Sequence, residues 1–412
     1  MSEGPPIDAG RVIADLRELD RRTGGPEGAR RVCWSEEWRV ARSFLDELLA
    51  EMGLVSERDP AGNLWARLGD RTSPALGLGS HLDSVPAGGW LDGALGVMAA
   101  LEVLRAWAHH GEELPMSLTL IDWADEEGSR FGRSLFGSSA FSGRLDPAEV
   151  AGLSDAGGLS IVDVLAENGV ALDRASGAAE RQGDLAAYLE LHIEQGPVLE
   201  AEGASAAAVD GCAAVERFRL VFRGQTSHAG TTPMDRRHDA GLAAAETALR
   251  IEEVGLLHGG VSTTGGLTLE PGIVSAIAGE AELLVDLRHP EAEPLSAMLA
   301  EALDAARAVA VTRGCELATE EIWRIAPTRF DDGLVSAARR ACAEVAGSDR
   351  VMTSGALHDA AEVARVRPAA MIFCPSTAGI SHAAREDTPE PALATAIEAF
   401  GLAVNRVLIA GR

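Results

Sequence analysis

The sequence predicts an α/β protein with a second, inserted α+β domain. Apolar runs typical of buried strands alternate with amphipathic or Ala-rich helical stretches in the first and last parts of the chain. This pattern changes after Cys212, where polar and apolar residues alternate as in a half-exposed strand. At 412 residues, the chain is also longer than one hydrophobic core usually supports. We therefore expect a catalytic domain at residues 1–212 and 327–412, and an inserted domain at residues 213–326.

Periodicity and end signals place the elements of the first domain. Ser35 is the expected N-cap of a helix ending at Glu51, and Gly53 follows where a C-terminal glycine is common. The predicted helices lie at residues 11–22, 36–51, 94–109, 161–168, 331–345, 358–364 and 391–409. The predicted strands lie at residues 74–78, 116–123, 186–193 and 369–374, and residues 61–67 are predicted to form a turn that enters a strand.

The inserted domain is predicted to hold two helices and about four antiparallel strands. Its helices lie at residues 239–254 and 295–312, and its strands at residues 217–223, 272–278, 281–287 and 315–322. A polar loop from Gly224 to Asp235 joins the first strand to the first helix. This composition predicts a compact α+β unit.

Charge and hydropathy exclude several classes of protein. The formal net charge is −27 and the sequence pI is near 4.7, which argues against nucleic-acid binding. No window holds 18 uninterrupted apolar residues, so no membrane span is expected. The acidic, Pro-containing start lacks the features of a signal peptide, which predicts a cytoplasmic protein.

Two residue types narrow the chemistry further. All 36 basic residues are arginine, which excludes reactions that need a lysine of this chain, such as Schiff-base formation. The five cysteines are scattered and never form a C-x-x-C pair, so neither a disulfide framework nor a thiolate zinc site is expected.

Polar side chains follow the apolar runs of the first domain. Because carboxyl ends of parallel strands meet at one edge of a sheet, we expect these side chains to converge. Taken singly, each side chain could belong to an ordinary hydrogen-bonded pair or to a solvated surface. Together, however, they are suited to binding two metal ions. They are His81, Asp83 and Asp92, then Asp125, Glu126 and Glu127, then His192, and finally His382.

Two stretches carry a resemblance to a known family, Glu126-Glu-Gly-Ser-Arg-Phe131 and His228-Ala-Gly-Thr-Thr-Pro-Met234. With them, nearly the whole chain resembles the hydantoinase/carbamoylase branch of the M20 metallopeptidase-like amidohydrolases. That branch contains N-carbamoyl-L-amino-acid hydrolases, β-ureidopropionases and allantoate amidohydrolases. The resemblance implies a mixed-sheet, aminopeptidase-like catalytic domain with an inserted ferredoxin-like domain that acts as a lid and dimerisation domain.

The resemblance also implies roles for the converging side chains. Two divalent ions, Zn²⁺ or alternatively Mn²⁺, Co²⁺ or Ni²⁺, would be bound. Glu126 would be the general base, and Asp83 would accept a hydrogen bond from His81 and fix its tautomer. The implied ligands are His81 and His192 for one ion, Glu127 and His382 for the other, and Asp92 as the bridge.

Substrate contacts are implied by the same resemblance. His228 would stabilise the oxyanion from across a homodimer interface, and Arg288 would bind the substrate carboxylate. Gln195 and His358 would line the pocket. Arg288 could instead form a surface ion pair, and His358 could cap a helix. The chain departs from the family at Ser275, which replaces a substrate-holding asparagine, and at Trp90, Leu91 and Leu357.

The resulting hypothesis is a two-metal hydrolase of a small ureido or amide acid, most simply an N-carbamoyl-L-amino acid. The products would be the amino acid, CO₂ and ammonia. An allantoate- or ureidoglycolate-type amidohydrolase and an N-acyl amino acid or dipeptide amidase are alternatives within the same chemistry. A binding protein for small acids on the same fold is the alternative without catalysis, although such a protein would have no need of the base Glu126.

Overall fold

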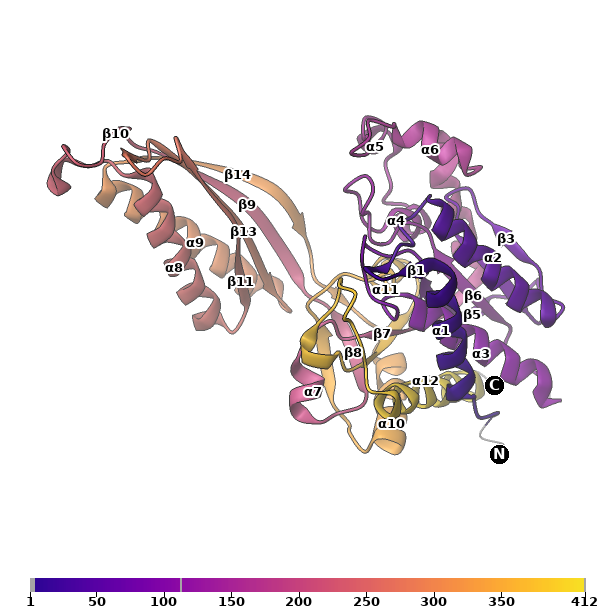
Figure 1. The fold of residues 1–412 in the computed structure, drawn as a ribbon. Helices are drawn as coiled ribbons and strands as arrows, with labels where there is room; N and C mark the ends of the chain where they lie inside the picture. Colours follow the sequence, from indigo (N-terminus) through magenta and orange to yellow (C-terminus); the bar gives the residue numbers. More distant parts are fainter. Residues whose placement is uncertain (1–3, 112, 411–412) are drawn as a thin grey trace. The chain divides into compact units, whose positions relative to one another are not determined.

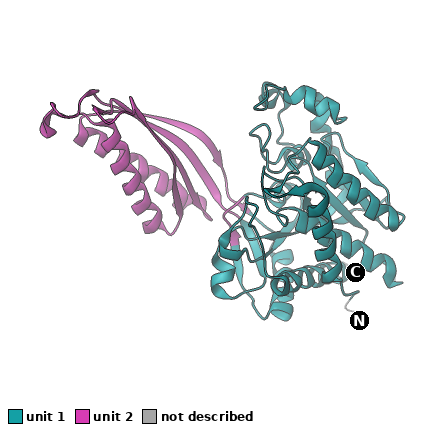
Figure 2. Ribbon diagram, viewed as in Figure 1, with its two compact units in different colours: residues 1–211, 329–352, 357–412 teal, residues 212–328, 353–356 magenta. Residues whose placement is uncertain are grey.

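The computed structural model describes residues 4–111 and 113–410, and the chain divides into two compact units (Figure 2). Unit 1 comprises residues 1–211, 329–352 and 357–412. Unit 2 comprises residues 212–328 together with the short segment 353–356, which the sequence pattern had not separated from the first domain. Each unit has its own sheet, and each is described by itself.

Unit 1 is built on a nine-stranded mixed sheet (Figure 1). Four neighbouring strands in its middle run parallel, so their carboxyl ends lie at one edge of the sheet: β17 (Ala369–Cys374), β7 (Leu185–Ile193), β5 (Ala75–His81) and β6 (Leu118–Trp123). On the side of β6, the sheet continues with the antiparallel strands β4 (Leu64–Leu68) and β3 (Ser56–Arg58). On the side of β17, it continues with the antiparallel strand β8 (Ala207–Cys212), which also pairs with β15 (Thr328–Arg329) and β16 (Val351–Ser354). The central strands are buried along nearly their whole length, which explains their continuous apolar runs.

Helices pack against this sheet. Ser35 caps α2 as predicted, since its side chain accepts a hydrogen bond from the Trp38 N–H at 3.2 Å. The longer helices are α1 (Ala9–Thr23), α2 (Glu36–Glu51), α3 (Ala94–His110), α10 (Asp332–Ala346) and α12 (Glu390–Ala410). The shorter ones are α4 (Phe136–Ser142), α5 (Pro147–Val150), α6 (Ile161–Glu167), α7 (Val198–Glu202) and α11 (Asp359–Val363), with a 3₁₀ segment at Leu172–Asp184. The sequence pattern did not predict α4, α5, α7, the 3₁₀ segment, β3, β8, β15 or β16.

Among the described helices, α12 alone has the length and apolar composition that a membrane span requires. It packs against α10, α1 and β17, and 56% of its apolar window is buried inside unit 1. Burial of this kind is typical of a core helix.

Unit 2 has the strand–helix–strand–strand–helix–strand order of a ferredoxin-like domain. Its four antiparallel strands lie in the order β11 (Val261–Glu270), β13 (Glu280–His289), β9 (Ala214–Arg223) and β14 (Glu316–Ile325). The helices α8 (Ala240–His258) and α9 (Ala292–Arg313) pack against this sheet (Figure 1). The predicted strand at residues 272–278 was wrong: the strand lies earlier, as β11, and only Ala276–Ile277 of that stretch pairs, as β12 with β10 (Ser227–His228).

Candidate metal centre

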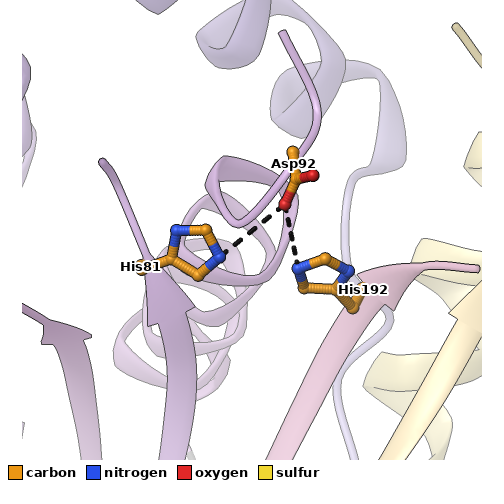
Figure 3. A group of neighbouring side chains, drawn as sticks. All are labelled: His81, Asp92 and His192. Carbon is orange, nitrogen blue, oxygen red and sulfur yellow. Dashed lines mark ion pairs between the residues drawn. The ribbon is translucent and has the colours of Figure 1, made fainter. Parts of the chain in front are cut away.

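The first candidate group joins the ends of two neighbouring parallel strands. His81 is the last residue of β5, His192 lies near the end of β7, and Asp92 lies in the loop before α3. Asp92 Oδ1 lies 3.7 Å from His81 Nε2 and 3.2 Å from His192 Nε2. Figure 3 shows both rings directed at this carboxylate. All three side chains are buried, and their ligand atoms lie close enough together to hold one metal ion.

A second group uses the other oxygen of the same aspartate. Asp92 Oδ2 lies 3.5 Å from His382 Nε2, which is also 3.5 Å from Glu127 Oε2. These three residues likewise could hold one ion. The structure thus brings together the five predicted ligands as two groups that share Asp92, each through a different oxygen.

The donor set fits two divalent cations. Imidazole and carboxylate are ordinary ligands for Zn²⁺ and related ions. Two candidate ligand atoms, His192 Nε2 and Glu127 Oε1, are buried and make no hydrogen bond of acceptable geometry with the described residues. Each is therefore an orphaned ligand atom that an ion would satisfy.

Gln195, which is predicted to line the substrate pocket, lies against the second ligand group. Its Nε2 donates to Asp92 Oδ2 at 2.8 Å and lies 3.3 Å from His382 Nε2. The amide N–H thus faces two candidate ligand atoms of the second group, a position that would also favour a cation. Its backbone is left-handed, with φ of 58°, a conformation that is uncommon for residues other than glycine.

Two other triads satisfy the same distance requirement. Glu190, His192 and His358 form the first, which shares His192 with the group above; the His192 and His358 rings lie 4.4 Å apart. Cys33, Asp83 and Asp125 form the second. His358 is buried at the N-cap position of α11, but its side chain makes no capping hydrogen bond, so the predicted capping role does not apply.

Asp83 acts on the site through atoms other than those predicted. His81 Nδ1 does bond to Asp83, but to its main-chain oxygen at 3.0 Å, while the carboxylate lies 3.8 Å away. The Asp83 carboxylate instead accepts the main-chain N–H groups of Glu126 at 3.3 Å and Glu127 at 3.2 Å. One residue therefore fixes the tautomer of His81 and also the backbone that carries both glutamates.

Carboxyl groups are crowded at this edge of the sheet. Burial, and then the charges of Asp359 and Glu127, raise the pKa of Glu126 well above its usual range. Burial and Asp92 do the same to the pKa of Glu127. Burial, and then the charge of His192, lower the pKa of His81 to about 4. At His192 burial also lowers the pKa, but the hydrogen bond and charge of Asp92 together with the charge of Glu190 outweigh it and raise the pKa to about 9. Such mutual repulsion is relieved when cations bind between the carboxylates.

Glu126 stands beside the first group without belonging to it. It follows β6 directly after Asp125, whose φ of 57° turns the chain into the site. Glu126 Oε2 lies 3.7 Å from His81 Nε2, and the residue is 9% exposed. The carboxylate is thus buried near the candidate ions.

Gly93 lies so close to the His81 ring that a larger residue would not fit. Its φ is 64°, and a β carbon there would lie 2.3 Å from His81 Cε1. We expect Gly93→Ala to displace the His81 ring and weaken metal binding, and to lower the free energy of unfolding by at least about 1 kcal/mol. Gly111→Ala is the matched control, because its φ is 77° but nothing lies within 4 Å of the added carbon. Metal titration of both variants distinguishes ring displacement from backbone strain, and equal titrations would contradict the expectation.

Two carboxylates that support the ligands were not predicted from the sequence. Glu190 accepts Ser80 Oγ at 2.7 Å and the N–H of Ala360 at 3.0 Å, and so ties α11 to β5. Its spacing of two from His192 on one strand puts both on the same face, a signal that could have found it. Glu386 binds the loop of Asp92, a contact across 294 residues that no local pattern predicts.

Two of the residues at which the chain departs from the family, Trp90 and Leu91, lie in the loop that carries Asp92. Leu91 is wholly buried, and Trp90 is 6% exposed, so neither offers much surface. Trp90 donates from Nε1 to Asp387 Oδ1 at 3.2 Å and packs beneath the Arg17 guanidinium at 3.4 Å. These contacts give both residues a packing role within unit 1.

The other predicted substrate residues lie in unit 2. His228 is exposed, and its Nδ1 accepts the N–H of Gly230 at 3.0 Å. Ser275 is also exposed. It lies beside His228, because its carbonyl accepts the N–H of Ala229 at 2.9 Å. Arg288 donates from Nε and Nη2 to Asp286 at 2.8 and 3.1 Å, and from Nη1 to the Gly355 carbonyl at 2.6 Å.

Comparison with known proteins identifies the family. The family model described as peptidase family M20/M25/M40 matches residues 77–406. An N-carbamoyl-L-amino acid amidohydrolase of Geobacillus stearothermophilus is 35% identical, with 91% of each chain covered. An allantoate amidohydrolase of Bacillus subtilis is 31% identical, covering 90% of this chain and 91% of its own. A crystal structure of a hydantoinase/carbamoylase family amidase from Burkholderia multivorans superimposes with a TM-score of 0.89 at 33% identity, covering 98% of each chain. The chain therefore belongs to peptidase family M20/M25/M40, in its hydantoinase/carbamoylase branch, and is an amidohydrolase.

Proposed function

We propose that the chain is a two-metal amidohydrolase that removes the carbamoyl group from N-carbamoyl-L-amino acids. The observation that carries the two-metal part is the position of Asp92, whose two oxygens face two different sets of ligands. His81 and His192 would complete one site, and Glu127 and His382 the other. The carbamoyl substrate is supported by the relative of 35% identity that covers nine-tenths of both chains.

Bound divalent ions would polarise the substrate carbonyl and lower the pKa of water. Glu126 takes a proton from the attacking water and returns it to the leaving nitrogen. Hydrolysis of the ureido bond releases the free amino acid and carbamate, which decays to ammonia and CO₂. Asp83 holds the main chain of Glu126, so the base keeps its place beside His81 during this transfer.

Two side chains of unit 2 have N–H donors that the proposed substrate contacts would use. Because His228 Nδ1 accepts a main-chain N–H, a neutral ring carries its proton on Nε2, where it is available to an oxyanion. Asp286 and Gly355 use three of the five N–H donors of Arg288 and hold its guanidinium in place. Two donors remain for a substrate carboxylate, and Ser275 and His358 would contribute to the pocket.

Dimerisation through unit 2 would bring His228 to the site of a second copy. The strand β11 is at the edge of its sheet, and apolar side chains are exposed along it and along α8. They are Leu249, Leu256 and Leu257 on α8, and Val261, Leu267 and Leu269 on β11. An exposed edge strand of this length, with apolar side chains on it and on the neighbouring helix, is a template for pairing with another chain. A second copy of this chain is the partner that we propose.

Allantoate is the second candidate substrate, because the allantoate amidohydrolase of B. subtilis matches over nearly the same length. The test is ammonia release from N-carbamoyl-L-amino acids, allantoate and ureidoglycolate by metal-free protein reloaded with Zn²⁺, Mn²⁺, Co²⁺ or Ni²⁺. We expect metal-dependent release, fastest from an N-carbamoyl-L-amino acid. Hydrolysis of N-acyl amino acids or dipeptides without release from any ureide would overturn the proposal.

A further inference from the structure

Glu386 is a buried carboxylate enclosed by the loop that carries Asp92. It is 2% exposed, and its Oε1 accepts the main-chain N–H groups of Leu91 at 3.1 Å and Asp92 at 3.0 Å. A β carbon on Gly89 would lie 2.0 Å from the same oxygen. The chain from Gly89 to Asp92 therefore wraps closely around this one atom.

The same residue is fixed to the segment that carries His382. Glu386 follows His382 by four residues, and its own N–H donates to the carbonyl of Ala383 at 2.9 Å. Glu386 thus connects two loops that are distant in sequence, one with Asp92 and one with His382. These are two of the three members of the second ligand group.

Only one of the two carboxylate oxygens makes this connection. Glu386 Oε2 is buried and has no hydrogen-bond partner among the described residues. A glutamine at this position can therefore reproduce both hydrogen bonds with its amide oxygen. An aspartate keeps the charge but is shorter by one methylene, about 1.5 Å, and cannot reach both N–H groups.

We propose that Glu386 is a positioning residue for the metal centre: by holding the main chain of Asp92 against the His382 loop, it sets the distance between the ligands of the second ion. The inference rests on the proposed two-metal function. Residues that orient ligands in this way typically change metal affinity by about 10- to 100-fold when they are replaced.

The experiment measures Zn²⁺ binding to metal-free protein by equilibrium dialysis with metal analysis, for wild type, Glu386→Asp and Glu386→Gln. We expect one of the two ions to bind at least about 10-fold more weakly to Glu386→Asp, and both ions to bind Glu386→Gln nearly as tightly as wild type. Glu102→Gln is the matched control: Glu102 is also buried and accepts a main-chain N–H through Oε1, at 3.1 Å, but it lies within α3. Circular dichroism and thermal unfolding confirm that each variant is folded.

The outcomes separate the inference from the function on which it rests. Wild-type protein that binds fewer than two ions would overturn the proposed function. Two-ion binding by wild type together with unchanged affinity in Glu386→Asp would overturn the positioning role alone. Equal weakening in the aspartate and glutamine variants would also overturn it, because the glutamine keeps both hydrogen bonds and should then bind the ions as wild type does.

Discussion

Glu126→Gln is expected to lower kcat at least about 100-fold while the protein keeps its full content of metal. The carboxylate lies 3.7 Å from His81 Nε2 but belongs to neither ligand group, so its loss should not release an ion. Glutamine has the same shape, and the Asp83 carboxylate still accepts the main-chain N–H of residue 126. What glutamine cannot do is take a proton from water. Steady-state kinetics and metal analysis of the same preparation check the expectation.

The neighbouring glutamate provides the contrast. Glu127→Gln removes a member of the second ligand group, so metal content is expected to fall along with activity. A Glu126→Gln enzyme with unchanged turnover would remove Glu126 as the base. Loss of metal in both variants would show that the two adjacent carboxylates do not have separate roles.

Mixed dimers extend this test to His228. A subunit with Glu126→Gln and a subunit with His228→Ala are each expected to be inactive as homodimers. If His228 serves the site of the partner subunit, a mixed dimer contains one site with both residues intact and regains part of the activity. Recovery of no activity would contradict the exchange of residues between subunits.

Much of the fold could be predicted because strands that are buried on both faces consist of continuous apolar residues, which are recognisable in the sequence. The central strands β5, β6, β7 and β17 are buried on both faces and appear as apolar runs that end at the polar site residues. The strand β11 escaped prediction because most of its side chains are exposed and it contains Gly265 and Gly266, so it shows neither an apolar run nor alternation. It is a strand because β13 pairs with it along its length.

The positions of the metal ligands could also be predicted from the buried strands, but the residues that hold these ligands in place could not. Strand ends bring His81 and His192 together in any parallel sheet of this order. The direction of a side chain within a loop is not a matter of spacing, so the sequence could not show that Asp83 turns its carboxylate towards the main chain of Glu126. The contact between Glu386 and Asp92 joins loops almost 300 residues apart and arises only when the sheet is assembled.

Asp92→Asn is expected to abolish the binding of both ions at ordinary metal concentrations and to lower kcat at least about 100-fold. Asp92 is the only residue that the two ligand groups share, and each group uses a different one of its oxygens. Asparagine keeps the size of the side chain but replaces one oxygen by an N–H₂ group and removes the charge that a bridging ligand supplies. Single-ligand variants such as His382→Ala should instead retain one ion.

Thermal unfolding provides a readout of this variant that does not depend on activity. An ion that binds only the folded protein adds about 2.7 kcal/mol of stability at a concentration 100-fold above its dissociation constant. Wild-type Tm is therefore expected to rise on addition of Zn²⁺, whereas the Tm of Asp92→Asn should not change. Without metal, the variant should be less stable than wild type: although burial raises the pKa of Asp92, the hydrogen bond and charge of His192 hold it below its usual range, and asparagine loses this pairing. A rise in the Tm of Asp92→Asn equal to that of wild type would mean that the ions bind without the shared carboxylate.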